Sequence, residues 1–394
     1  MRGAFLVPGD IMYRLVATCG FGLESVLSYE IRHLGFDGVE VSDGRIFFDA
    51  DEYGVAKANI WLRTAERVLI VLEEFPAGDF DALFDGAYAA DWSSVLSSND
   101  AFPVKGYSLN SKLTSIPACQ SVLKKAIVEK MKVQYGTEFL PERGTEKKIR
   151  FSIVKDMCTL MLDTSGDGLH KRGYRPLLNE APIRETLAAG MADLARVYDD
   201  STVVDPFCGS GTIVIESAMR ALNMAPGLSR SFAAEEYDIV GKEIFDRVRS
   251  EARSAVKSDV QFRGFGSDID PEAVRISREN AERAGVDRYC TFSLADAREI
   301  IPQTDSLIIT NPPYGERLSS PAEAEKLCSD FGRQVLKGSQ RGIYVISSLQ
   351  DFEKHFGKQA SRRRKLYNGM IPCQLYMYFG NRRKAEQFLP TIVP

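Results

Sequence analysis

A four-residue motif, Asn311-Pro312-Pro313-Tyr314, directly follows the apolar run 307–310 and has side chains suited to chemistry. The side-chain oxygen of Asn311 and the main-chain carbonyl of Pro312 can each accept an N–H from one planar amino group. The nitrogen is then turned toward tetrahedral geometry, and its lone pair is aimed at an electrophilic carbon. The two prolines stiffen the loop, and Tyr314 offers a ring face for stacking. The motif predicts methyl transfer onto a base amine or a carboxamide.

A glycine-rich turn lies about a hundred residues upstream of this motif. Residues 201–204 are typical of a short buried strand, and Asp205-Pro206-Phe207-Cys208-Gly209-Ser210-Gly211-Thr212 follows at its carboxyl end. Glycines let a ligand approach the backbone closely, and the amino terminus of the next helix favours negative charge. Because any turn between a strand and a helix can use a glycine pair, the prediction of a cofactor site depends on the whole eight-residue motif.

Two further predicted strands end in acidic residues. The segment 266–271 closes the second strand at Asp268, which is placed to hold two ribose hydroxyls, with Ile269 against an adenine face. Asp270 precedes a proline and is expected to cap the following helix. The third strand ends at Asp296, which could accept a hydrogen bond from an adenine amino group. A helix cap is the alternative role for each of these acids.

The order of the segments is a strand with a glycine turn, two strands with acids, and a strand with Asn-Pro-Pro-Tyr. It resembles the class I S-adenosylmethionine-dependent methyltransferases, particularly those that act on amino nitrogens. The resemblance implies a Rossmann-like α/β domain whose parallel sheet finishes in an antiparallel pair. The runs 342–347, 363–367 and 374–379 fit that ending, because Asn368-Gly369 is a strong hairpin signal. An amphipathic helix is expected over 183–197.

Length and composition are those of a globular protein with two or three domains. The 394 residues are 44% hydrophobic and 26% charged. No apolar stretch approaches the roughly 20 residues that cross a bilayer, and no signal peptide opens the chain, so a cytoplasmic protein without membrane contact is expected. Seven cysteines without a Cys-x-x-Cys pair and only three histidines predict no metal site. Met12 is a possible start, and residues 1–11 are excluded from these expectations.

Basic residues are concentrated in one part of the chain. Residues 101–155 contain eleven basic and four acidic side chains and so carry a net charge of +7. Because the whole chain has a net charge of −4, the remaining residues carry −11. Such a surface is typical of phosphate binding, because neutralised phosphates release counterions. We predict that Lys124 and Lys125 bind RNA, and that a second cluster with Lys171 and Arg172 touches phosphate. A solvated helix face is the alternative.

The amino-terminal region resembles a ferredoxin-like region followed by a THUMP domain, an RNA-binding module of RNA-modifying enzymes. The resemblance is carried by three segments, which are residues 18–24, 113–115 and 120–127. Alternating strands, a Ser42-Asp43-Gly44 hairpin signal and helical periodicity over 23–34 agree with an α+β region. The expected domains are a ferredoxin-like region (12–68), a THUMP domain (69–164) and a methyltransferase domain (165–394).

Over nearly its whole length the chain resembles the THUMP-containing ribosomal RNA guanine-N2 methyltransferases of the RlmL and YpsC kind. The resemblance implies S-adenosylmethionine as cofactor, RNA as partner with ribosomal RNA favoured, and N2-methylguanosine in large-subunit ribosomal RNA as product. It assigns cofactor contacts to Asp205, Phe207, Gly209, Gly211, Thr212, Asp268, Ile269 and Asp296, and the target guanine to Asn311, Pro312 and Tyr314. Larger members of the family carry a second methyltransferase domain, which is not expected here.

Several alternatives stay open at this point. A transfer RNA guanine-N2 methyltransferase, a DNA adenine-N6 methyltransferase and a protein glutamine-N5 methyltransferase would share the strand-end motifs, and a non-enzymatic RNA-binding assembly factor would share the amino-terminal region. The charged segment 229–259 is expected to be an insertion that either covers the substrate or faces solvent. The sequence does not specify the modified nucleotide or the oligomeric state.

Overall fold

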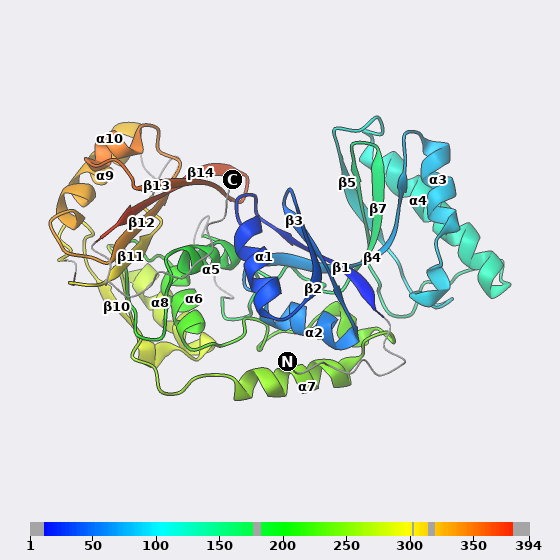
Figure 1. The fold of residues 1–394 in the computed structure, drawn as a ribbon, viewed down its shortest axis with the longest axis horizontal. Helices are drawn as coiled ribbons and strands as arrows, with labels where there is room; N and C mark the ends of the chain where they lie inside the picture. Colours follow the sequence, from blue (N-terminus) through cyan, green and yellow to red (C-terminus); the bar gives the residue numbers. More distant parts are fainter. Residues whose placement is uncertain (1–11, 176–182, 302, 314–319, 381–394) are drawn as a thin grey trace. The chain divides into compact units, whose positions relative to one another are not determined.

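The computed structural model describes residues 12–175, 183–301, 303–313 and 320–380, which form two compact units (Figure 1). The first unit comprises the chain up to Cys19, Glu24–Lys171 and Ala225–Ala255, and the second comprises Gly20–Leu23, Arg172–Met224 and the chain from Val256 onward. Within the described ranges, no helix is both long and apolar enough to span a membrane.

The first half of the first unit has the predicted ferredoxin-like order. Its elements are β1 (Tyr13–Cys19), α1 (Glu24–His33), β2 (Asp37–Ser42), β3 (Arg45–Ala50), α2 (Glu52–Trp61) and β4 (Ala65–Pro76). The side chain of Asp51 caps α2 by accepting a hydrogen bond from the Gly54 amide at 2.7 Å. Ser42 pairs with Arg45 across a two-residue loop, which confirms the predicted hairpin.

The second half of the first unit extends the same sheet. Its elements are α3 (Phe80–Ala89), the short η1 (Trp92–Ser94), β5 (Val104–Leu109), α4 (Ile116–Tyr135), β6 (Ile149–Val154) and β7 (Met157–Asp163). The strand order is β2-β3-β1-β4-β7-β6-β5, and the 12-residue β4 pairs with both β1 and β7. This shared strand joins the two halves into one seven-stranded sheet. Helix α4 buries Leu123, Ile127 and Met131 and ends at the left-handed Gly136.

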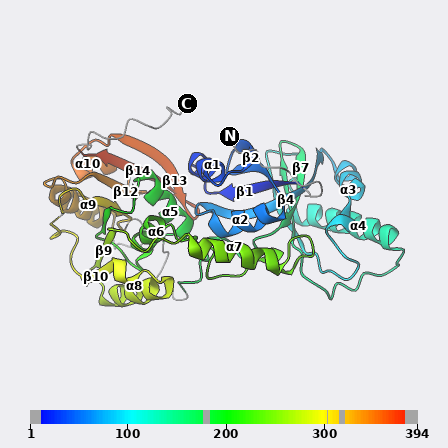
Figure 2. The same ribbon diagram turned by 60° about the horizontal axis from the view of Figure 1, so that its bottom comes forward.

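The insertion between the first two methyltransferase strands belongs to the first unit. It forms η2 (Ala233–Glu236) and α7 (Lys242–Ser254), and α7 packs along α2, as Figures 1 and 2 both show. Helix α7 buries Phe245 and Val248 on one face. The guanidinium of Arg230 donates to four main-chain carbonyls in the segment 165–171. The insertion therefore packs against the amino-terminal elements, an arrangement that its charged sequence did not indicate.

The second unit is a seven-stranded sheet in the order β10-β9-β8-β11-β12-β14-β13. Its strands are β8 (Thr202–Asp205), β9 (Arg263–Asp268), β10 (Cys290–Leu294), β11 (Leu307–Thr310), β12 (Gly342–Ser347), β13 (Arg362–Asn368) and β14 (Ile371–Phe379). The first five are parallel, and β14 pairs antiparallel with β12 and with β13. The predicted antiparallel ending is confirmed.

Helices cover the second sheet. They are α5 (Glu185–Leu194), α6 (Thr212–Ala221), α8 (Pro271–Ala284), α9 (Pro321–Val335) and α10 (Phe352–Phe356), with the short η3 (Asp287–Tyr289) before β10. Beneath α9 and α10, the aromatic side chains Phe331, Phe356, Tyr376 and Tyr378 pack with Ile308 and Val345 into one buried cluster. The predicted cap of α8 is confirmed, because the Asp270 carboxylate accepts from the Glu272 amide at 2.9 Å.

Candidate active site

The carboxyl ends of β8, β9 and β11 bring Asp205, Asp268 and Asn311 to the same edge of the second sheet. Strands β8 and β11 are adjacent, and the Thr310 hydroxyl donates to Asp205 Oδ1 at 2.7 Å. From β8 the chain builds the sheet outward in one direction through β9 and β10, and then returns to the other side of β8 at β11. Ligands of open α/β sheets bind in the crevice at such a switch point. The strand-end residues selected from the sequence therefore meet where a site is expected.

Asn311 has an unused hydrogen-bond acceptor in a buried position. Its side chain is 7% exposed, and within the described residues its Oδ1 has no hydrogen-bond partner. Leaving a buried polar atom unpaired costs about 1 to 3 kcal/mol, so such an atom requires an explanation. A bound N–H donor would satisfy it. Pro312 and Pro313 follow and are half-buried, whereas Tyr314 lies outside the described residues.

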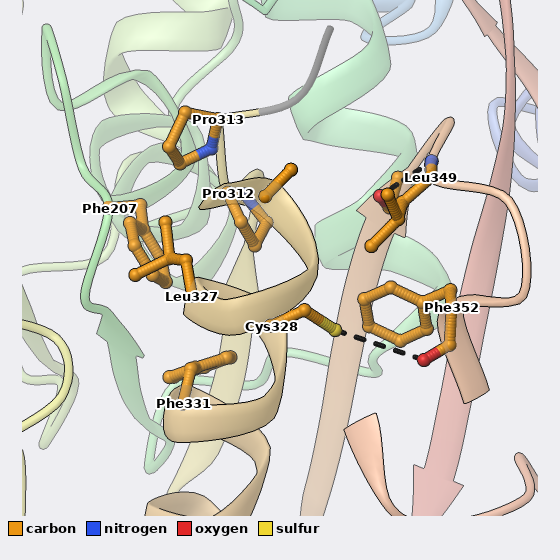
Figure 3. A pocket seen from close by; sticks show the side chains of 10 residues that line it. Phe207, Pro312, Pro313, Leu327, Cys328, Phe331, Leu349 and Phe352 are labelled. Carbon is orange, nitrogen blue, oxygen red and sulfur yellow. Dashed lines mark hydrogen bonds between the residues drawn. The ribbon is translucent and has the colours of Figure 1, made fainter. Parts of the chain in front are cut away.

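A pocket adjoins the two prolines (Figure 3). It is a small, partly open hollow that is lined mainly by apolar and aromatic side chains. Phe207, from the glycine turn, and Phe331 of α9 both line the pocket, and their ring centroids are 5.1 Å apart. Ser347, at the end of β12, also lines the pocket. These apolar and aromatic side chains offer a surface beside the Asn311 loop against which a flat ring can pack.

The two predicted glycines of the turn serve different purposes. Both have positive φ, 51° at Gly209 and 79° at Gly211, a conformation that favours glycine. A Cβ on Gly211 would lie 2.9 Å from the Ser277 Cβ, so this glycine also permits close packing against α8. A Cβ on Gly209 would meet nothing within 4 Å. The open space beside Gly209 fits the close approach of a cofactor.

Thr212, the first residue of α6, is turned toward the protein interior. Its side chain is 1% exposed, and its hydroxyl accepts from Arg175 Nη1 at 2.9 Å and meets the Ser210 hydroxyl at 3.1 Å. These contacts place Thr212 in a support for the glycine turn. A direct cofactor contact through this hydroxyl, as expected from the resemblance, would have to share it with Arg175.

Asp268 links the glycine turn to the second strand. One carboxylate oxygen accepts from the Gly209 amide at 2.9 Å, and the other accepts from the Asp270 amide at 3.1 Å. Each oxygen keeps a further lone pair for a ribose hydroxyl. Ile269 is 70% exposed and Leu294, paired with Asp268 across β9 and β10, is 60% exposed. Two exposed apolar side chains beside an acid suit the ribose and adenine of a nucleoside.

Asp296 is already engaged by a neighbouring cation. The Arg298 guanidinium donates to both of its carboxylate oxygens, and this contact holds the pKa of Asp296 below its ordinary value. A carboxylate held in this way stays ionised at neutral pH. An adenine amino group would have to share it with Arg298, so we expect a smaller contribution from Asp296 than from Asp268.

We expect Asp268→Ala to weaken the binding of S-adenosylhomocysteine by about 1 to 3 kcal/mol, because charge-assisted hydrogen bonds to the ribose are lost. Isothermal titration calorimetry measures the difference. Asp270→Ala is the matched control, since the Asp270 side chain only caps α8. Equal affinities for wild type and Asp268→Ala would place the ribose contact elsewhere.

Asp205 is the buried acid of the site. It is 1% exposed, and burial raises its pKa to about 7, while hydrogen bonds from the Thr310 hydroxyl and the Phe207 amide act in the opposite direction. Because both donors bind Oδ1, Asp205 joins the glycine turn to the strand that leads into Asn311. A cation beside the carboxylate, such as the ammonium of an amino acid, would favour its ionised form.

The raised pKa of Asp205 predicts a pH dependence of stability. The folded carboxyl keeps its proton up to about pH 7, whereas the unfolded one loses it near pH 4. Rising pH between these values therefore favours the unfolded state, by up to about 1.4 kcal/mol per pH unit. Asp205→Asn removes this titration, so its melting temperature should fall less than that of the wild type between pH 5 and 8. Parallel melting curves from circular dichroism would contradict the assignment.

A buried ionic cluster supports the site, and the sequence analysis did not identify it. Arg172 Nε lies 3.5 Å from Glu216 Oε1, and the Tyr174 hydroxyl donates to the same oxygen at 3.0 Å. Arg175 lies 3.2 Å from Glu185, whose pKa is raised chiefly by burial. A glutamate in the otherwise apolar start of α6, Thr-Ile-Val-Ile-Glu, was the available signal.

Two of the four side chains predicted to bind RNA, Arg172 and Lys124, have ion-pair partners within the protein, and Arg172 is also buried. Arg172 is 3% exposed within the buried cluster. The Lys124 ammonium lies 2.7 Å from Glu142 and 3.3 Å from the centroid of the Phe102 ring. We therefore leave Arg172 out of the RNA-binding surface, whereas Lys124, whose side chain is 32% exposed, stays a prediction. Lys171 is exposed, with Asp167 at 3.3 Å.

Lys125 is another predicted RNA-binding residue that the structure leaves at the surface. It is exposed on α4, and its ammonium lies 6.0 Å from the centroid of the Phe84 ring. Five residues further along α4, the Lys130 ammonium lies 5.3 Å from the centroid of the Tyr88 ring, and the rings of Phe84 and Tyr88 stack on each other. This surface of α3 and α4 combines positive charge with aromatic rings, which suits the phosphates and bases of a nucleic acid.

Comparison with known proteins agrees with the fold. The model of the RMKL-like methyltransferase domain matches residues 172–377, that of the RlmL ferredoxin-like domain matches 14–69, and that of the THUMP domain matches 77–163. Together with the strand-end residues, these matches define a class I S-adenosylmethionine-dependent methyltransferase with an amino-terminal RNA-binding module.

Two relatives identify the family to which the chain belongs. The chain is 40% identical over 381 residues to a Bacillus subtilis protein named "Putative RNA methyltransferase YpsC", covering 95% of this chain and 99% of that one. It is 32% identical to the ribosomal RNA large subunit methyltransferase K/L of Psychromonas ingrahamii, covering 94% of this chain but only 51% of that protein. The chain belongs to the THUMP-containing, RlmL- and YpsC-like family of S-adenosylmethionine-dependent RNA methyltransferases.

A solved relative supports the choice of cofactor. The crystal structure named "SMU.472, a putative methyltransferase complexed with SAH" superposes on this chain with a TM-score of 0.88, and the two sequences are 40% identical. The match covers 95% of this chain and 99% of that one. The ligand of that complex is the product form of S-adenosylmethionine, so the cofactor predicted from the sequence is confirmed for this chain.

Proposed function

We propose that this enzyme transfers a methyl group from S-adenosylmethionine to the exocyclic N2 of a guanine in large-subunit ribosomal RNA. The observation that carries the proposal is the buried Oδ1 of Asn311, which has no hydrogen-bond partner among the described residues and lies beside an apolar pocket. The likeness to the K/L enzymes, whose name states a large-subunit ribosomal RNA activity, supports the choice of RNA. This chain spans about half the length of those enzymes.

The residues of the second unit fit the cofactor. Open space at Gly209, the free lone pairs of Asp268 and the exposed Ile269 offer contacts for the amino-acid portion, the ribose and the adenine of S-adenosylmethionine. When bound, S-adenosylmethionine supplies an electrophilic methyl group. Asp205 accepts hydrogen bonds from both the glycine turn and β11. It therefore fixes the position of the cofactor site relative to the Asn311 loop.

Asn311 and the Pro312 carbonyl are proposed to hold the target amine. Two acceptors on one amino group direct its hydrogens and turn the nitrogen lone pair away from the ring. The aromatic and apolar walls formed by Phe207, Leu327 and Phe352 would receive the ring. A base stacked in an RNA helix cannot enter such a pocket, so we expect an everted or single-stranded guanine.

The alternatives differ in the product that they leave. A DNA adenine-N6 enzyme would form N6-methyladenine, and a glutamine-N5 enzyme would methylate protein. The THUMP match and the cationic, aromatic face around Lys125 favour RNA over both. In a non-enzymatic factor, an apolar residue at position 311 would be more stable than an asparagine whose buried oxygen has no hydrogen-bond partner among the described residues.

Nucleoside analysis tests the proposal. Ribosomal and transfer RNA from a strain that lacks the gene are separated, digested and compared with wild type by mass spectrometry. We expect a loss of N2-methylguanosine confined to the large-subunit ribosomal RNA, and restoration by the purified enzyme with labelled S-adenosylmethionine. A loss in transfer RNA would change the substrate, and a deficit of N6-methyladenosine would change the base.

A further inference from the structure

The outermost strand of the second sheet, β13, begins with four consecutive basic residues, 362–365. Charged side chains on an edge strand discourage pairing with other chains, and this is a sufficient reason for some of them. Arg363 also has a partner, because its Nε lies 3.4 Å from Glu353. These four residues therefore have to be considered individually.

Strand pairing places Lys365 level with the pocket. Ser347, which lines the pocket, pairs with Gln374 of β14, and Gln374 pairs with Lys365 of β13. Directly paired residues point to the same face of a sheet, and two strand spacings amount to about 10 Å. Lys365 therefore lies on the same face as the pocket lining, at the same level along the strands, and only two strands away.

The surroundings of Lys365 leave its charge available to a ligand. The side chain is exposed, and among the described residues it has no ion-pair partner. Its ammonium lies 5.5 Å from the centroid of the Tyr367 ring, which restrains it on this face. Beyond Tyr367, the strand turns at Asn368-Gly369, and Met370 at the tip is 93% exposed.

We propose that the hairpin formed by β13 and β14 binds the RNA strand next to the target nucleotide, with Lys365 on a backbone phosphate and Met370 against a neighbouring base. The proposal rests on the proposed function. A base that enters the pocket leaves its flanking nucleotides at the rim, and a cation about 10 Å from the lining is within reach of an adjacent phosphate. An exposed apolar side chain at the tip can cover an unstacked base.

The test compares charge reversal at two positions of the same strand. Lys365→Glu reverses the proposed phosphate contact, whereas Arg362→Glu reverses an exposed charge three residues further from the hairpin tip and on the opposite face. Lys365→Arg keeps the charge, and Lys365→Gln only neutralises it. The probe is an unmodified transcript of large-subunit ribosomal RNA, and affinity for S-adenosylhomocysteine is the control for folding of the catalytic unit.

We expect Lys365→Glu to raise both the Kd and the KM for the transcript roughly five-fold and to lower the salt slope of binding by about one ion. Lys365→Gln should show a smaller effect, and Lys365→Arg and Arg362→Glu should stay close to wild type. Equal effects of the two reversals, or an unaffected Lys365→Glu, would overturn the hairpin contact while wild-type methylation of RNA still supports the proposed function. A wild-type enzyme that methylates no RNA would overturn both.

Discussion

Replacing Asn311 by alanine is expected to lower the rate of methyl transfer by about 100-fold or more, while the affinity for S-adenosylhomocysteine stays close to wild type. The expectation follows from the position of Oδ1, a buried acceptor without a partner among the described residues. Removing a single contact that aligns and polarises a reacting group typically costs a factor of this size. Single-turnover transfer of labelled methyl and calorimetry with S-adenosylhomocysteine measure the two quantities.

Asn311→Asp is the matched control for this experiment. It keeps an acceptor oxygen at the same distance from the backbone and replaces the amide NH2 by a second oxygen, so it should retain more activity than the alanine variant. An alanine variant with the wild-type rate would show that the target amine is held by other groups. An alanine variant that also loses cofactor affinity would show a structural role, because Asn311 follows the strand that contacts Asp205.

The second large effect is expected in the buried cluster that supports the glycine turn. Arg172→Met should lower the free energy of unfolding by about 3 to 5 kcal/mol, because it removes the ion-pair partner of the buried Glu216 and leaves the Tyr174 hydroxyl as the hydrogen-bond donor to that carboxylate among the described residues. Urea unfolding should be followed by far-ultraviolet circular dichroism. Tryptophan fluorescence would not serve, since Trp61 and Trp92 both lie in the first unit.

A double variant tests whether Arg172 and Glu216 contribute to stability together or independently. Arg172→Met combined with Glu216→Met removes both charges and keeps similar volume, and such replacements are often neutral or stabilising. The double variant should therefore recover most of the stability that the single variant loses. If the two substitutions were additive instead, the side chains would act independently, and the cluster would not be a coupled unit.

The buried cluster around Glu216 and the Asn311 loop are connected by hydrogen bonds that both lead to the glycine turn. Arg175 connects the cluster to the hydroxyl of Thr212, which begins the helix after the glycine turn. The Asp205 carboxylate connects the same turn to the strand before Asn311. A loosened cluster is thus expected to lower cofactor affinity first, whereas the Asn311 variants change turnover at unchanged affinity.

Local signals in the sequence were sufficient to predict the hairpin and the helix cap, and to find the motifs at the strand ends. The Asn368-Gly369 hairpin and the Asp270 cap depend on neighbours within a few residues, so composition and spacing specify them directly. Parallel strands in a Rossmann-like order place their carboxyl ends at one edge, and this brings Asp205, Asp268 and Asn311 together once the order is known.

Only the tertiary structure decided which side chains are free to act. Lys124 and Arg172 look like surface cations in the sequence, yet one is bound by Glu142 and the other is buried with Glu216, 44 residues away. The insertion 225–255 packs on α2, although it is encoded between two strands of the other unit. Burial and ion pairing depend on contacts between distant segments, and the local sequence carries no signal for them. For the same reason, the unpaired oxygen of Asn311 and the alignment of Lys365 with the pocket became visible only in the folded chain.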